Sequence, residues 1–404
     1  MSVTDGDGLV LLGGEGAEPL LAAAVGQAGG ELLDWRLDHV DNQPGRSTTA
    51  TYLARVRWPY GTRQELVGCS VRAGGPDERD SRARLLGDGE REVATWLYPH
   101  DPDLPGLARA AYPERMAELV NQQGLVARRV RAEDLRLQMV TYRPRRRAVL
   151  RLEVDGRTWY VKVLREGLFD EVQARHQLLE EAHVPSPRVL AATEDHLLVL
   201  EALPGRPLAR AIFDKHPPCS AEQVVELLDA LPAGLSRLER RPPWSDAVGH
   251  YAQVVLGAVP DQERRLAWLV QQVEAGLAGI PMGDEPTHGD FHEGQLHTAG
   301  GRICGLLDVD TIGPGRRADD LACLVAHLST VQRMDAVQTR RVHHLIRSWV
   351  PVFDERVDPV ELRLRAAAVI ISLATGPFRG QEPNWRAETL AILDAAEALV
   401  RQVG

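Results

Sequence analysis

Apolar and polar residues alternate along several short stretches of the chain, which is the pattern of half-buried β-strands. Between two of these stretches lies Asp155-Gly156, a dipeptide that favours a two-residue hairpin turn. The pattern predicts eight strands: Val10–Leu12, Thr49–Trp58, Leu66–Val71, Leu135–Tyr142, Ala148–Val154, Arg157–Leu164, His196–Leu200 and Ile303–Leu307.

Helical periodicity, with apolar residues three and four positions apart, is concentrated in the second half of the chain. The predicted helices are Pro19–Gln27, Glu90–Leu97, Pro113–Gln123, Glu171–Ala182, Gln262–Leu277, Leu321–Leu328, Leu362–Ala374 and Arg386–Arg401. Together with the strands, they predict an α/β (α+β) protein. We expect an N-terminal cap module over residues 1–90, a β-rich region over 91–203 and a helical region over 204–404.

Composition and charge narrow the classes of function. The 404 residues are 44% apolar and 26% charged with a formal net charge of −10, typical of a globular protein and unfavourable for general binding to nucleic acid or anionic membranes. The four cysteines are far apart, which argues against a zinc site or a disulfide framework. The N-terminus Met1–Asp5 lacks the basic start of a secretory signal, and the longest apolar run, near Ala366–Phe378, is too short to span a bilayer. We expect a cytoplasmic protein.

Lysine is scarce. Of 47 basic residues only Lys162 and Lys215 are lysine, and the others are arginine. A compact ammonium and a planar guanidinium are not interchangeable at a tight site, so a lysine that persists in an arginine-rich chain is a candidate functional residue. Lys162 stands inside a predicted strand, between apolar neighbours.

The residue types that phosphoryl transfer needs are gathered in the run Thr287–Gln295 and shortly after it. That reaction needs a carboxylate to accept the proton of the attacking hydroxyl, oxygen ligands for magnesium and a cation on the phosphates. Asp290 is the candidate base, Gln295 and Asp308 are candidate magnesium ligands, and Lys162 is the candidate phosphate-binding cation.

The motif His288-Gly289-Asp290-x-His292-x-x-Gln295, with Asp308 downstream, resembles the aminoglycoside phosphotransferase and choline kinase family, over about residues 90–404. The resemblance implies a bilobal protein-kinase-like fold that uses ATP and Mg²⁺. It also implies that Glu171 pairs with Lys162, with Glu180 as the rival, and it places the adenine-binding hinge at Glu201, Ala202 and Leu203.

The sequence departs from the commonest family pattern. Gln295 replaces the usual asparagine, Asp308-Val309-Asp310 replaces the usual Asp-Phe-Gly-like triplet, and the turn Arg143–Arg147 stands where a glycine-rich loop is expected. The glutamine and the extra N-terminal module resemble the maltokinase-like branch, and within it the glucosamine kinases most closely. This resemblance implies that the sugar contacts Asp290, Asp310, Gln381, Glu382 and Trp385.

Several residues keep two interpretations. Asp310 either binds metal or caps a turn, and Gln381, Glu382 and Trp385 line the sugar site or form a surface turn. The arginine turn is a triphosphate clamp through Arg146, a solvated turn or a nucleic-acid patch. His288 is expected to bond the catalytic loop. Asp320 is expected to brace that loop or cap the following helix.

We therefore expect an ATP-dependent sugar kinase that makes glucosamine 6-phosphate from glucosamine. A maltokinase and an aminoglycoside phosphotransferase are the enzyme alternatives, and a nucleotide-binding pseudokinase scaffold is the non-enzyme alternative. The expected partner is a small sugar rather than a nucleic acid or a membrane, for a monomer or a homodimer.

Overall fold

The structure is a computed structural model that describes residues 6–87, 91–332 and 334–403. Met1–Asp5 and Glu90, which enter two of the sequence expectations, lie outside the described residues. The chain divides into two compact units, which are described separately. The first unit contains Met1–Asp170, Val189–Ala202 and Arg379–Pro383; the second contains Glu171–Arg188, Leu203–Phe378 and Asn384–Gly404.

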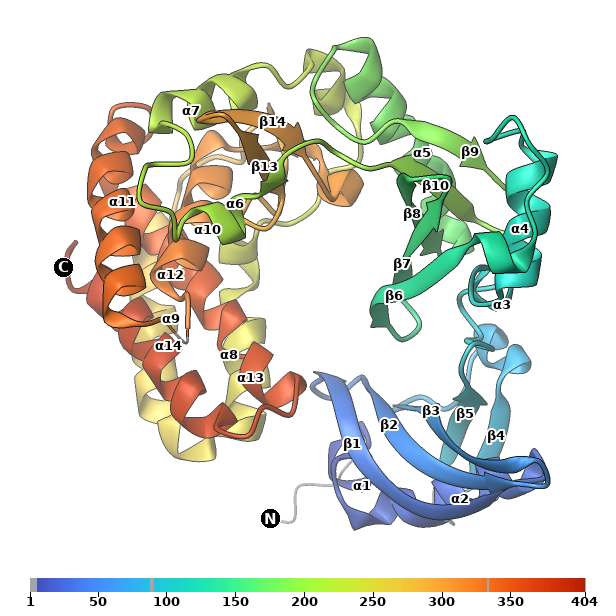
Figure 1. The fold of residues 1–404 in the computed structure, drawn as a ribbon. Coiled ribbons are helices and arrows are strands. Elements are labelled where there is room, and N and C mark those ends of the chain that lie inside the picture. The colour runs from blue at the N-terminus through green and yellow to red at the C-terminus, as the bar shows by residue number, and fades with distance from the viewer. Residues whose placement is uncertain (1–5, 88–90, 333, 404) are drawn as a thin grey trace. The chain divides into compact units, whose positions relative to one another are not determined.

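The first unit begins with an antiparallel sheet in the order β1-β2-β3-β5-β4. Its strands are β1 (Glu31–Gln43), β2 (Ser47–Trp58), β3 (Gly61–Arg72), β4 (Arg84–Gly87) and β5 (Glu92–Leu97). Helices α1 (Leu9–Gly13) and α2 (Glu18–Gln27), linked by the 3₁₀ turn η1 (Glu15–Ala17), lie against one face of this sheet (Figure 1). The sheet continues past residue 90, because β5 pairs with both β3 and β4.

Two secondary-structure predictions in this region are wrong. Val10–Leu12, predicted as a strand, lies in α1, and the described part of Glu90–Leu97, predicted as a helix, forms β5. Periodicity does not distinguish helix from strand in such short apolar runs, so tertiary packing decides. Val93 to Trp96 are buried on both faces of the strand, which removes the alternation that would have indicated it.

The second sheet of the first unit has the order β6-β7-β8-β10-β9. Its strands are β6 (Arg136–Arg143), β7 (Arg147–Val154), β8 (Arg157–Leu164), β9 (Val189–Ala192) and β10 (Leu197–Glu201). Asp155 and Gly156 both have positive φ, 51° and 73°, as the predicted hairpin turn requires. Helices α3 (Leu107–Ala110) and α4 (Pro113–Gln122) share an apolar core with this sheet, and η3 (Ala132–Asp134) precedes it.

The second unit is mostly helical. Its helices are α6 (Leu208–Ala211), α7 (Ala221–Asp229), α8 (Val248–Ala258), α9 (Glu263–Leu277), α10 (Arg317–Ser329), α11 (Ala336–Asp354), α12 (Pro359–Leu373) and α14 (Trp385–Val400). Helix α12 is the centre of this unit, because it packs against α8, α9, α10 and α14 and most of its side chains are buried. Helices α5 (Glu166–Glu181) and α13 (Gly376–Arg379) each extend across the division between the units.

Two small sheets complete the second unit. One joins β11 (Arg206–Pro207), β13 (Leu296–Ala299) and β14 (Arg302–Leu306); the other pairs β12 (Glu285–Thr287) with β15 (Gly313–Gly315). The remaining 3₁₀ segments of the chain are η2 (Glu78–Arg82), η4 (Ala233–Arg237), η5 (Trp244–Ala247), η6 (Pro260–Gln262) and η7 (Val309–Thr311).

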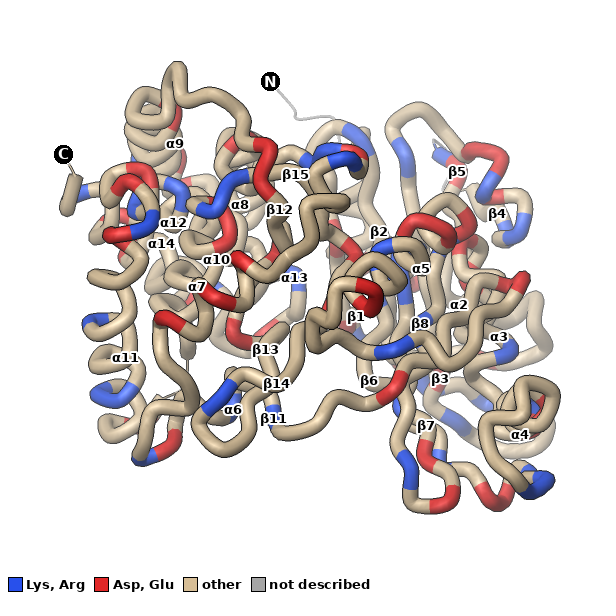
Figure 2. The backbone as a smooth tube through the Cα atoms, turned by 90° about the horizontal axis from the view of Figure 1, so that it is seen from above, with Lys and Arg blue, Asp and Glu red and all other residues tan. Residues whose placement is uncertain are grey.

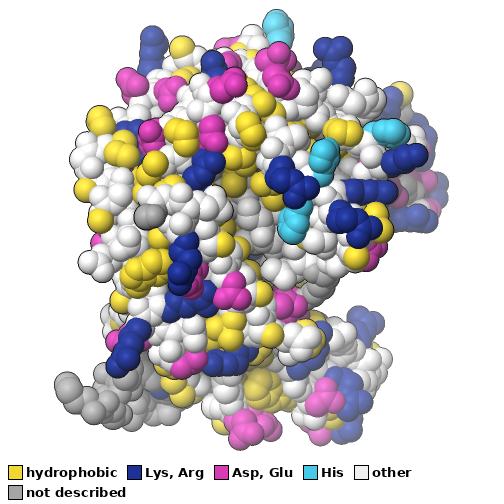
Figure 3. All heavy atoms as spheres, turned by 90° about the vertical axis from the view of Figure 1, so that its left-hand side faces the viewer, with side chains coloured by type: hydrophobic (Ala, Val, Ile, Leu, Met, Phe, Trp, Pro, Cys, Tyr) yellow, Lys and Arg dark blue, Asp and Glu magenta, His cyan; other side chains and the backbone are white. Residues whose placement is uncertain are grey.

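The mixed α/β class predicted from the sequence is confirmed. Basic and acidic residues both occur along the whole length of the chain (Figure 2), and the face drawn in Figure 3 likewise carries basic and acidic side chains dispersed among neutral ones. Within the described residues, every helix is too short or too polar to cross a membrane.

Candidate active site

The loop that carries Asp290 follows β12 in the second unit. Strand β12 pairs with β15 in register, with Thr287 opposite Gly313, and the Thr287 hydroxyl donates to the Gly313 carbonyl at 2.9 Å. Gly289 has φ of +80°, and a Cβ at this position would lie 2.7 Å from the Thr311 carbonyl oxygen. Only glycine allows this backbone conformation and this approach. The loop therefore lies directly against the segment that follows Asp308.

Asp320 anchors the Asp290 loop by hydrogen bonds to the loop backbone. This residue lies in the first turn of α10 and is fully buried. Its two carboxylate oxygens accept the backbone N–H groups of His288 and Gly289, each at 2.8 Å. Burial raises the pKa of Asp320 to about 6, although the two amide donors and Arg317 oppose that rise. At neutral pH the carboxylate is ionised and accepts both bonds.

His288 joins the Asp290 loop to the Asp308 segment. Its Nε2 lies 2.8 Å from the Leu307 carbonyl, and its own carbonyl accepts the Thr311 hydroxyl at 2.8 Å. A carbonyl only accepts hydrogen bonds, so Nε2 carries the ring proton and Nδ1 is left to accept the Asp290 N–H, at 3.4 Å. Two segments that carry candidate catalytic carboxylates are thus linked by two hydrogen bonds, and a third holds the Asp290 loop together.

Asp308 and Gln295 are also connected through the backbone. Asp308 follows β14 with φ of +53°, a left-handed conformation that is unfavourable for a residue other than glycine. The preceding Leu307 N–H donates to the Gln295 carbonyl at 2.7 Å. Carboxylate and amide oxygens are the ligands that Mg²⁺ prefers, so this pair of side chains is chemically suited to hold the ion.

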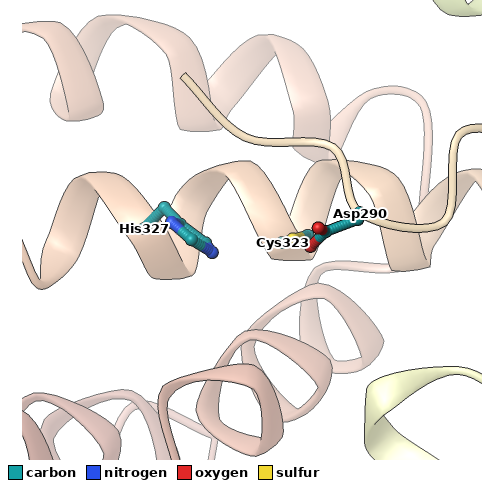
Figure 4. A group of neighbouring side chains, drawn as sticks. All are labelled: Asp290, Cys323 and His327. Atoms are coloured by element: carbon teal, nitrogen blue, oxygen red, sulfur yellow. The ribbon is translucent and has the colours of Figure 1, made fainter. Parts of the chain in front are cut away.

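The side-chain amide of Gln295 also contacts His292, whose Nε2 lies 2.9 Å away. The His292 ring is stacked in parallel on His327 of α10, with centroids 4.1 Å apart. The predicted site residues did not include His327, Cys323 one turn earlier in α10, or Glu293 in the Asp290 loop. Figure 4 shows Cys323 and His327 on α10 beside Asp290. The i,i+4 spacing of Cys323 and His327 was the available signal.

Lys162 lies in the first unit, in the middle of β8 between Val149 of β7 and Leu198 of β10. Its side chain is only 5% exposed. A lysine is almost never fully buried unless its ammonium is paired, and the role of Lys162 on the phosphates stays a prediction. Glu201 ends β10 opposite Trp159, and Ala202 and Leu203 follow in irregular structure; their role as an adenine-binding hinge stays a prediction.

Glu171 pairs with arginines of its own unit. Its carboxylate lies 3.0 Å from Arg175, which also donates to the Ile312 carbonyl at 3.1 Å, and 4.0 Å from Arg241. Its pairing with Lys162 stays a prediction.

The arginine turn shows two different environments within the first unit. Arg145 is 6% exposed; its guanidinium lies 2.6 Å from Asp80 and 3.0 Å from Asp103, and its N–H donates to Asp101 at 2.7 Å. Arg146 is 55% exposed and lies 3.4 Å from Asp41. None of the three interpretations of the turn foresaw the burial of Arg145, which connects the second sheet to Asp80 of η2.

The predicted acceptor residues are distributed over both units. Asp310 is buried in η7 of the second unit, two residues after Asp308. Trp385, also in the second unit, begins α14 and packs edge-on against Phe378, with centroids 5.0 Å apart. Gln381, with φ of +49°, and Glu382 belong to the first unit.

Comparisons with known proteins identify the family to which this chain belongs. A family model described as "Phosphotransferase enzyme family" matches residues 139–351, more than half of the chain. No curated protein matches the sequence.

Among solved structures, the chain is similar to choline kinase from Cryptosporidium parvum Iowa II, with 10% identity and a TM-score of 0.49 over 71% of this chain and 95% of that one. It is also similar to a thermostable mutant of the aminoglycoside phosphotransferase APH(4)-Ia in complex with ADP and hygromycin B. That match has 16% identity and a TM-score of 0.47, over 70% and 97% of the two chains.

Proposed function

We propose, from the premise that this chain belongs to the phosphotransferase enzyme family, that it is an ATP-dependent sugar kinase acting on glucosamine to form glucosamine 6-phosphate. The observation that carries the proposal is the linked pair of loops in the second unit. Asp320 anchors the Asp290 loop through two backbone N–H groups, and His288 and Thr311 join that loop to the Asp308 segment. Such preorganisation is what phosphoryl transfer demands, because the reaction depends on positioning and charge stabilisation.

In this mechanism each side chain has one task. Asp290 orients the acceptor hydroxyl and accepts its proton as the oxygen attacks the γ-phosphorus. Lys162 binds the phosphate oxygens, and the backbone of Glu201–Leu203 binds adenine. Asp308 and Gln295 would hold magnesium, which supplies positive charge to the phosphates when bound. The family membership and the residue types support these roles.

The choice of glucosamine is supported by the resemblance of 381–385 and the Asp308 segment to glucosamine kinases. An ammonium at C2 is best recognised by a carboxylate, since a charge-assisted hydrogen bond is stronger than a neutral one. Glu382 and Asp310 are the acidic candidates, and Gln381 and Trp385 would align the ring. Maltokinase and aminoglycoside phosphotransferase remain the alternative activities, and a pseudokinase scaffold the alternative without turnover.

The test is ATP consumption at saturating Mg·ATP with glucosamine, N-acetylglucosamine, glucose, maltose and an aminoglycoside. We expect kcat/KM for glucosamine to exceed that for glucose by at least about tenfold, or roughly 1.4 kcal/mol. N-acetylglucosamine should not react, because acetylation removes the charge and adds bulk. Maltose or the aminoglycoside as the best acceptor would replace glucosamine in the proposal, and no turnover with any acceptor would favour the scaffold.

A further inference from the structure

Asp290, Cys323 and His327 bring three metal-ligating atom types together in the second unit. One carboxylate oxygen, the thiol sulfur and one ring nitrogen all lie within 4.8 Å of one another. Figure 4 shows Cys323 and His327 on successive turns of α10, with the Asp290 side chain reaching toward them from its loop. The mechanism of phosphoryl transfer uses Asp290 alone of these three residues.

Glu293 lies beside the same histidine, because the ligand atoms of His292, Glu293 and His327 also lie within 4.8 Å of one another. Its Oε2 lies 3.8 Å from Nδ1 of His327, and this buried oxygen makes no hydrogen bond in the part of the chain that the structure describes. A buried carboxylate oxygen without a donor is costly. A cation beside Glu293 would remove the penalty.

The protonation states of Cys323 and His327 suit a metal that displaces protons. Burial, together with the charges of Asp290 and Asp320, holds the pKa of the Cys323 thiol well above its usual range. Burial and His292 hold the pKa of His327 well below its usual range, so its ring is neutral and offers a lone pair. A bound divalent cation stabilises the Cys323 thiolate, so the thiol loses its proton to solvent when the metal binds.

We propose that Asp290, Cys323 and His327 form a site for Zn²⁺, with three protein ligands and an open fourth position, that competes with catalysis by occupying the base. Zinc takes thiolate, imidazole and carboxylate ligands in tetrahedral geometry at about 2.0–2.3 Å, which places ligand atoms about 3.3–3.8 Å apart. The ligand atoms of Asp290, Cys323 and His327 lie within 4.8 Å of one another, so the three side chains would have to move closer together when the ion binds. Mg²⁺ prefers oxygen ligands, so Cys323 and His327 select zinc over the magnesium of the reaction.

The site differs from the magnesium ligands in its residues and in its ion. Asp290 and His327 are partly exposed, which gives a cation a route to the buried sulfur of Cys323. The binding of zinc stands on these side chains alone, whereas the loss of activity rests on the proposed function.

Cobalt titration of the full chain tests binding independently of activity. Co²⁺ in a tetrahedral site with one thiolate gives a thiolate-to-metal charge-transfer band in the near ultraviolet and intense visible bands. We expect both in the wild-type protein, their loss on addition of Zn²⁺, and no charge-transfer band in Cys323→Ser. Cys219→Ser is the matched control, because Cys219 is also buried in the second unit. A charge-transfer band that persists in Cys323→Ser, or none in the wild type, overturns the proposal.

Inhibition is measured with saturating Mg·ATP and a chelator as the reversal. Zn²⁺ should inhibit the wild type and Cys219→Ser equally, and the half-inhibitory concentration should rise at least about tenfold in Cys323→Ser and in His327→Gln. The folding of each variant is checked by urea denaturation. If the half-inhibitory Zn²⁺ concentration is the same in the wild type and all three variants, and added Mg²⁺ relieves the inhibition, the inhibitory ion binds at Asp308 and Gln295. That result would refute the proposal. A cobalt signal without any kinase turnover would refute the proposed function and leave the zinc site intact.

Discussion

The Asp320 loop anchor and the Arg145 cluster are both buried charged groups, but they differ in what they hold. Asp320 accepts two backbone N–H groups and thereby sets the path of the loop that carries Asp290. Arg145 is surrounded by side-chain carboxylates of Asp80 and Asp103 and connects the second sheet to η2. A charge that binds backbone groups fixes local geometry, whereas a charge that binds distant side chains fixes how segments pack. The first should affect catalysis and the second stability.

Asp290→Asn tests the role of the Asp290 loop in catalysis and should give the largest effect. The substitution keeps the shape of the side chain but removes the base, so turnover should fall by about two to four decades while ATP binding and unfolding free energy change little. Steady-state kinetics, nucleotide titration and urea denaturation measure the three quantities. Retention of most of the turnover would remove Asp290 from the role of base.

Arg145→Met tests whether the buried Arg145 cluster stabilises the packing of the first unit. The variant removes Arg145 from the buried carboxylates of Asp80 and Asp103, of which Asp80 keeps Arg72 at 3.5 Å. Removing one partner of a buried ion pair costs about 3–5 kcal/mol. We expect that loss in urea denaturation, with kcat of the folded fraction nearly unchanged.

Arg146→Met is the matched control in the same turn. Arg146 is exposed and its pair with Asp41 is a surface contact, worth at most about 1 kcal/mol. A clear rise in KM for ATP in this control would support the triphosphate clamp, and equal destabilisation of both variants would contradict the distinction between the two arginines.

A pH titration tests the other side of the comparison, the buried carboxyl group of Asp320. Its folded pKa of about 6 lies above the ordinary value of 3.8, so between about pH 4 and 6 the folded chain keeps a proton that the unfolded chain has released. The contribution of Asp320 to stability therefore falls as pH rises through this window, by up to about 3 kcal/mol, and is constant above it.

The asparagine in Asp320→Asn cannot ionise, so the unfolding free energy of this variant lacks the decrease with pH that Asp320 causes. The difference in unfolding free energy between wild type and variant should thus move against the wild type from pH 4 to pH 6.5, measured by urea denaturation. A difference that is independent of pH would show that the carboxyl group is not protonated in the folded state near pH 5.

Local patterns were sufficient where one short segment determines its own structure. The hairpin β7–β8 follows from Asp155-Gly156 between two alternating runs, and α9, α12 and α14 follow from helical periodicity. The patterns failed at Val10–Leu12 and at Glu90–Leu97, where few apolar residues fit either structure. Strand β1 was not predicted, and it is a long strand whose residues are mostly half-exposed.

The candidate site in the second unit also combines features that local sequence predicts with features that depend on tertiary packing. Asp290, Gln295 and Asp308 were predicted from residue type and spacing alone, because these match the needs of phosphoryl transfer. Packing between distant segments determines which of its two expected roles Asp320 takes, places Cys323 and His327 near Asp290, and buries Arg145. Spacing along the chain reports chemical capacity, but contacts between segments far apart in sequence depend on how helices and loops pack, and no local pattern encodes that packing.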